Sequence, residues 1–121
     1  MLTPLIAALL AAQSAQAPAQ PPAELPPLSQ ESRALLRCSA AFALVSQRQS
    51  IGEEAARKWP PLETRGREFF VRSLAQLMDE TGLDRDGIAW LAGFEAKALR
   101  DSGETDKVMP SCLVMLEASG V

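Results

Sequence analysis

The sequence predicts an all-α protein: a small four-helix bundle, orthogonal or up-and-down, stapled by one disulfide. Apolar residues recur at helical spacing through most of residues 29–121, and no segment there alternates apolar and polar residues as a half-buried strand would. Two cysteines lie near the two ends of this region, after an apolar, alanine-rich leader. A leader favours export into an oxidising compartment, where two thiols can form a structural bond.

Residues 1–19 have the pattern of a signal peptide. Their apolar core, residues 5–12, is shorter than the roughly 20 residues that a helix needs to span a bilayer. Small residues then offer three cleavage sites, after Ser14, Ala17 and Ala19, so we expect processing between the first and the last of these. No lipobox cysteine follows the core, and we expect no stable membrane anchor after processing.

A proline-rich spacer, residues 20–28, separates the leader from the helical domain. Five of the nine prolines in the chain fall within residues 18–28. This composition favours extended polyproline II and disorder, with a proline-motif ligand as the alternative. The domain that follows, residues 29–121, has the size of one unit with one core, which buries only about 60–65% of its unfolded surface and gains from a covalent cross-link.

The first predicted helix runs from Ser29 to about Ser50, with Ser29 as the N-cap. Its apolar stripe consists of Leu35, Cys38, Phe42 and Val45. This spacing places Cys38 on the buried face. In residues 53–58, two acidic residues lie four positions before two basic residues, and this i, i+4 spacing predicts one or two exposed helical turns. A Trp-Pro-Pro motif then ends these turns.

Three further helices complete the predicted bundle. The second covers residues 62–81 and stops at Gly82, and the third runs from Arg85 to about Asp101 after Asp84 as N-cap. The core positions expected on the third helix are Ile88, Leu91, Phe94, Ala98 and Leu99, with Trp90 at its flank. The last helix ends near Ser119, with Pro110 in its first turn or at a break just before it. Its core positions are Met109, Cys112, Leu113 and Leu116.

Cys38 and Cys112 thus lie on buried stripes of the first and last helices. Two buried free thiols, which behave as small hydrophobes, are the alternative to a bond. Export favours the disulfide Cys38–Cys112.

Catalytic chemistry finds little support in the sequence. The chain has no histidine, which excludes Ser-His and Cys-His pairs and histidine metal ligands. The carboxylate pairs are Glu53/Glu54, Asp79/Glu80 and Asp84/Asp86. Each has an ordinary explanation in a solvated helix face or a helix end, and the loop around Asp84 lacks the first and last acidic ligands of a calcium loop. We expect no enzyme, no cofactor and no metal site.

The leader, the segment at residues 38–42 and the segment at residues 110–112 resemble small periplasmic acid-stress chaperones, which are helical and hold one disulfide. The cysteine separation of those chaperones is shorter, and the resemblance transfers no functional residue. The net charge of −3, with acids and bases interspersed, argues against a nucleic-acid partner.

The sequence therefore predicts a periplasmic or secreted, non-catalytic module. We expect it to bind another envelope or secreted protein or to stabilise an envelope assembly. A periplasmic stress chaperone, a holdase with a single disulfide, is the alternative. The sequence leaves the oligomeric state open.

Overall fold

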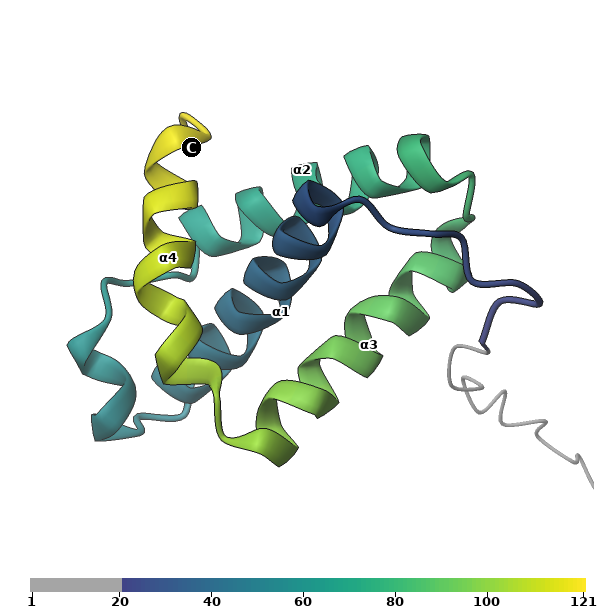
Figure 1. Ribbon diagram of the computed structural model, residues 1–121. Coiled ribbons are helices and arrows are strands. Elements are labelled where there is room, and N and C mark those ends of the chain that lie inside the picture. The colour runs from purple at the N-terminus through teal and green to yellow at the C-terminus, as the bar shows by residue number, and fades with distance from the viewer. Residues whose placement is uncertain (1–20) are drawn as a thin grey trace, which may run out of the picture.

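The part of the chain that the structure describes is a bundle of four α-helices. The computed structural model describes residues 21–121, and the predicted signal peptide lies outside them. The elements are α1 (Gln30–Ser50), the 3-10 helix η1 (Glu54–Lys58), α2 (Arg65–Thr81), α3 (Arg85–Ser102) and α4 (Thr105–Ala118). The described part of the chain contains no strand (Figure 1), so the all-α prediction is confirmed. Within it, no helix is both long and apolar enough to cross a membrane.

Helix α1 is the centre of the bundle. It packs against α2, α3 and α4, and each of these makes most of its contacts with α1 rather than with the others. The buried residues of α1 point in nearly every direction around its axis: Ser32, Leu35, Leu36, Cys38, Ser39, Ala40, Ala41, Phe42, Leu44 and Val45. A helix that buries residues on most of its sides must be covered on most of them, and three shorter helices provide that cover.

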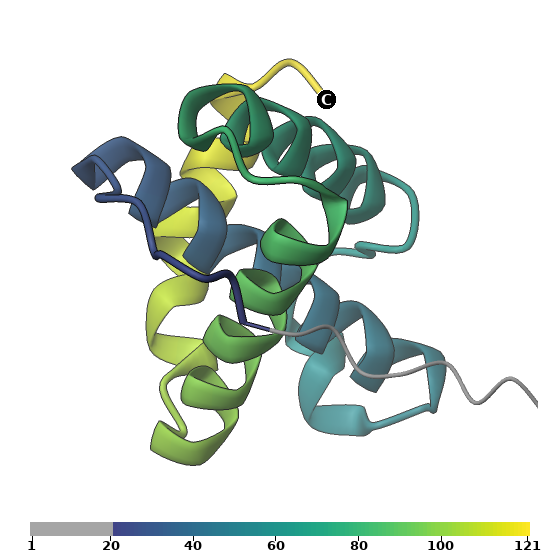
Figure 2. The same cartoon turned by 90° about the vertical axis from the view of Figure 1, so that its right-hand side faces the viewer.

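Helices α1 and α2 run side by side and antiparallel, in contact from Ser32 with Glu80 to Phe42 with Phe69, whereas other helices of the bundle cross. Helix α4 stands upright in both views while α2 lies across it (Figures 1 and 2). The bundle therefore combines one antiparallel pair, α1 and α2, with the crossing expected of an orthogonal arrangement.

Local sequence signals set most helix ends. The Ser29 side chain accepts a hydrogen bond from the Ser32 backbone N–H at 3.0 Å, and Asp84 Oδ1 accepts one from the Gly87 N–H at 2.8 Å, so both predicted N-caps are confirmed. Gly82 ends α2 in the left-handed conformation, with φ of 72°, which other residues rarely adopt.

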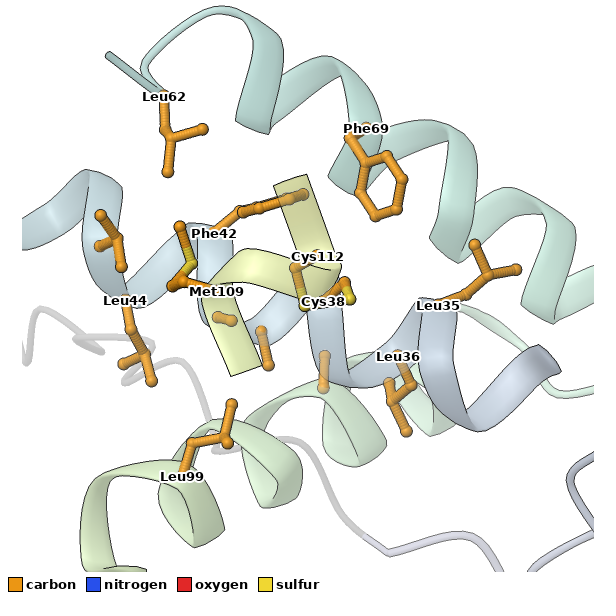
Figure 3. Close-up of a cluster of buried hydrophobic side chains, with 14 of the residues drawn as sticks. Leu35, Leu36, Cys38, Phe42, Leu44, Leu62, Phe69, Leu99, Met109 and Cys112 are labelled. Carbon is orange, nitrogen blue, oxygen red and sulfur yellow. A yellow bond between two sulfur atoms is a disulfide. The ribbon is translucent and has the colours of Figure 1, made fainter. Parts of the chain in front are cut away.

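The core forms where α1 meets α2, α3 and α4 (Figure 3). Phe42 of α1 and Phe69 of α2 pack edge to face, with ring centroids 5.2 Å apart. Leu62 is fully buried although it precedes α2, which begins three residues later than the sequence predicted. Residues 21–28 form neither helix nor strand, and Leu28 packs against the core.

Two predicted core positions on α3 are wrong. Phe94 is 58% exposed, and Ala98 is exposed too. Because α3 packs almost entirely on α1, only a narrow stripe of it is covered, and that stripe includes Ile88, Leu91 and Leu99. Phe94 instead stacks on Trp90 at the edge of this stripe, with ring centroids 5.3 Å apart.

The predicted place of Pro110 is also wrong. Helix α4 begins at Thr105, so Pro110 lies inside it, in the second turn. Proline has no N–H, so the Asp106 carbonyl lacks the usual helical donor at this point. The helix continues because the missing bond lies near its N-terminus, and the backbone hydrogen bonds of the following turns remain.

Candidate functional site

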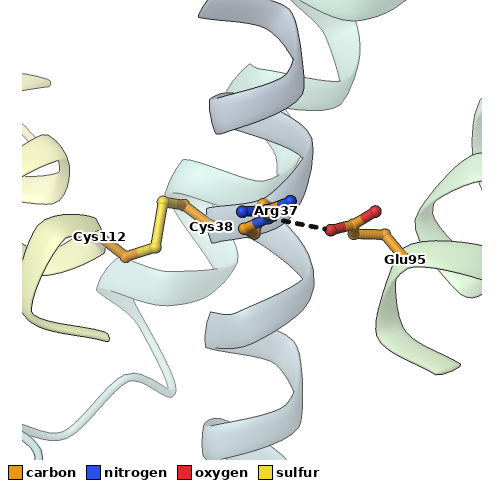
Figure 4. Close-up of a disulfide and its surroundings, with 4 residues drawn as sticks. All are labelled: Arg37, Cys38, Glu95 and Cys112. Carbon is orange, nitrogen blue, oxygen red and sulfur yellow. Dashed lines mark hydrogen bonds and ion pairs between the residues drawn. A yellow bond between two sulfur atoms is a disulfide. The ribbon is translucent and has the colours of Figure 1, made fainter. Parts of the chain in front are cut away.

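A disulfide joins the first and last helices. The Cys38 and Cys112 sulfurs are bonded, and their Cα atoms lie 5.2 Å apart. Both side chains are buried, and the bond crosses directly from α1 to α4 (Figure 4). The predicted pairing is confirmed. Because neither sulfur is accessible to an attacking thiolate, the bond is structural rather than a site of thiol exchange.

The disulfide also indicates the compartment. Disulfides persist where the surroundings are oxidising, and they are rare where glutathione and thioredoxin keep thiols reduced. The protein therefore folds in a non-reducing compartment. On another side of α1, Arg37 Nε lies 3.2 Å from Glu95 Oε1 and links α1 to α3 (Figure 4).

A cluster around Asp106 joins η1 to the start of α4. Lys58 Nζ donates to Asp106 Oδ2 at 2.8 Å, and the Trp59 indole N–H donates to Asp106 Oδ1 at 3.1 Å. The hydrogen bond from Lys58, and then that from Trp59, lowers the pKa of Asp106. The residues lie at the surface, so this cluster orients the segment more than it stabilises the fold.

Gln49 organises the chain between α1 and α2, which sequence reasoning missed. Its Nε2 lies 3.0 to 3.3 Å from three backbone carbonyls, those of Ala56, Trp59 and Pro60. Its Oε1 accepts from the Leu62 backbone N–H at 3.1 Å. One side-chain amide therefore provides hydrogen bonds to the backbone groups of a turn that has no regular backbone hydrogen-bond pattern of its own. No sequence signal marks this role, since a glutamine in the last turn of a helix is usually solvated.

The first acidic pair has no shared site. Glu53 and Glu54 stand at the start of η1, and no ion pair of the described residues includes either one. The i, i+4 pairing expected for residues 53–58 does not form, because a 3-10 helix places i and i+3 on one face. Lys58 pairs with Asp106 instead, and Ala56 of η1 is buried rather than exposed.

The other acidic pairs stand at helix ends. Glu80 accepts hydrogen bonds from Ser32 Oγ at 2.5 Å and from Gln76 Nε2 at 3.0 Å, and these bonds lower its pKa in that order of effect. Asp84 and Asp86 begin α3. Among the residues that the structure describes, no three acidic or cysteine side chains gather as a metal-binding group.

An open groove lies between the C-terminal half of α1 and the start of α2. Its volume is about 780 Å³, and its apolar floor includes Phe42, Pro61 and Phe70. Gly66 faces α1 at this point: a Cβ there would lie 3.5 Å from the Phe42 Cβ and 3.1 Å from the Cβ of Leu62, in the turn before α2. The exposed polar side chains around it include Gln47, Glu63 and Arg67, which we call the rim.

The rim side chains are unengaged. The side chains of Gln47, Glu63 and Arg67 make no hydrogen bond to the other described residues, and the two charged side chains form no ion pair there. One side chain of each charge and one amide thus face solvent above an apolar floor. This combination suits a ligand that has both apolar side chains and polar backbone groups.

Comparison of the chain with models of protein families, with curated proteins and with solved structures finds no match.

The disulfide generates a quantitative prediction. The two cysteines are 74 residues apart, and in the chain-entropy model a bond that closes such a loop stabilises by about 4–5 kcal/mol. We expect Cys38→Ser and Cys112→Ser to lower the free energy of unfolding by similar amounts, up to that value. The double variant should lose little more than either single variant, because all three remove one constraint. Denaturant titration measures these losses, and losses that add would contradict a shared bond.

Proposed function

We propose that this chain is an exported, non-catalytic module that binds a segment of another envelope or secreted protein. The observation that supports it is the α1–α2 groove, with its apolar floor and its unengaged rim. An extended polypeptide is the ligand that best matches these groups. An apolar side chain of the partner would contact Phe70 and Pro61, while Gln47 could bond its backbone.

The groove favours binding over catalysis. Its lining includes the hydroxyls of Ser46 and Ser50, and the Ser50 hydroxyl donates to the Gln47 carbonyl at 2.7 Å rather than to a base. A serine nucleophile needs a base within hydrogen-bond reach. The rim has one acid and one base, which fits a polypeptide better than a polyanion.

The groove can be tested by site-specific cross-linking in the compartment where the protein works. A photo-reactive residue in place of Gln47 should trap one partner protein, and a photo-reactive residue in place of Val114, which is 70% exposed on α4, should not trap it. Arg67→Glu should reduce the yield severalfold, because it reverses the charge at the rim. Arg72→Glu, on the same helix but outside this groove, is the matched control.

Two outcomes would contradict the proposal. One is an equal yield of the same adduct from positions 47 and 114. The other is a normal yield in Arg67→Glu with a reduced yield in Arg72→Glu.

The periplasmic or secreted location also belongs to this proposal. It rests on the leader and on the disulfide, which requires a non-reducing compartment. We expect protein recovered from the periplasm or the medium to begin between Ala15 and Gln20, as read by intact mass or N-terminal sequencing. Full-length chain recovered only from the cytosol would contradict export.

A stress chaperone is the second candidate, and two carboxylates favour it. Glu80 links α2 to the start of α1, and Asp106 links α4 to η1; the pKa of each is lowered by its hydrogen bonds. A carboxylate whose pKa is lower in the folded state stabilises the fold above its unfolded pKa. That contribution disappears as the pH falls through the folded pKa, so acid would loosen both links.

Acidification distinguishes the two candidates. The Asp106 pair is exposed and contributes less than about 1 kcal/mol after solvent screening, so we expect the binding module to stay folded at about pH 3, with a modest loss of thermal stability. Asp106→Asn should flatten part of that pH dependence. Near-ultraviolet circular dichroism and an apolar dye measure the outcome. Strong dye binding at acid pH, together with suppressed aggregation of a client protein, would favour the holdase.

A further inference from the structure

The outward face of α3 has a line of exposed residues that form no ion pair with the other described residues. Asp86, Gly93 and Arg100 are spaced by seven residues, so they lie nearly above one another on the helix. All three are exposed, on the side opposite the buried residues of α3. Ala89 and Lys97 flank this line and are exposed as well.

Gly93 is the unexplained member of the line. Glycine in a helix interior costs roughly 0.5–1 kcal/mol relative to alanine. Its φ is not positive, and a Cβ at this position would meet nothing within 4 Å. Neither the backbone of α3 nor its packing therefore requires glycine here. Glycine at a helix surface suits a site where another backbone approaches closely.

We propose that the occupant of this face is a second copy of the chain, whose α3 packs antiparallel across a two-fold axis at Gly93. Asp86 lies seven residues before the axis and Arg100 seven residues after it, so the symmetry places each Asp86 opposite Arg100 of the second copy, twice per dimer. A parallel pair would instead bring like charges together. Charge complementarity thus selects the antiparallel arrangement.

The flanking residues fit the same axis. Trp90 precedes Gly93 by three residues and Lys97 follows it by four, on the same side of the line. In the antiparallel pair the aliphatic part of Lys97 covers the Trp90 ring of the second copy, while its ammonium keeps its bond to Asp101. Phe94 holds the Trp90 ring by stacking, with an interplanar angle of 21°. This support makes Trp90 a rigid contact.

The interface is small, because it is built on one helix face. Interfaces that bury less than about 1,200 Å² in total are typical of weak association, so we expect a dimer that dissociates in the micromolar range. The contact leaves the α1–α2 groove free, and the proposal does not depend on what that groove binds.

Analytical ultracentrifugation of the oxidised protein over a range of concentrations tests the dimer. We expect the native chain to change from monomer to dimer as concentration rises. Asp86→Arg should weaken the dimer at least about tenfold, because it places two arginines opposite each other at both ends of the contact. Arg100→Asp should do the same, and the double variant Asp86→Arg/Arg100→Asp should restore dimerisation. Asp79→Arg, the same charge change at an exposed position of α2, is the control and should leave dimerisation unaltered.

The double variant separates pairing from folding. Asp86 lies in the first turn of α3, where a negative charge favours the helix dipole, so its replacement also lowers thermal stability slightly. That loss should persist in the double variant while the dimer returns. Gly93→Ala should act in the opposite sense: it should raise the melting temperature by a few degrees and weaken the dimer.

Three results would overturn the proposal. The first is a monomer at every concentration. The second is dimerisation that Asp86→Arg leaves intact, or that Asp79→Arg weakens equally. The third is a double variant that fails to recover the dimer although it is folded.

Discussion

The Cys38–Cys112 bond is the constraint on which the rest of the structure depends. Helix α4 is the shortest of the four α-helices, has a proline in its second turn, and makes most of its contacts with α1 alone. Its buried side chains include Met109 and Leu116, which fill the core beside α1. Without the covalent link, the entropy of the free chain end would oppose this packing, and loss of α4 would expose one whole side of the central helix.

The central place of α1 also explains where the candidate surfaces lie. Three helices cover α1, but each uses only one face to do so, which leaves the opposite face of α3 in solvent and an open groove beside the contact of α1 with α2. Both surfaces therefore follow from one arrangement. The groove offers unengaged polar groups above an apolar floor, and the α3 face offers a self-complementary charge pattern.

Sequence reasoning predicted the features that local chemistry determines. Ser29 and Asp84 cap their helices, Gly82 ends α2, and the cysteines pair because helical spacing placed both on buried faces. It failed where distant segments decide the outcome. Phe94 has the spacing of a core residue, and only the narrow contact between α3 and α1 shows that it is exposed.

The groove could not have been predicted in the same way. It depends on the packing of α1 against α2 and on the turn that Gln49 holds together, and the periodicity of apolar residues predicts neither.

Hydrogen exchange of the Cys38→Ala/Cys112→Ala variant tests most directly the claim that the structure depends on the Cys38–Cys112 bond. The account predicts that amides of α4 exchange far faster than in the native protein while the core amides of α1 remain the best protected. Unchanged protection of α4, or an equal loss of protection in all four helices, would contradict it.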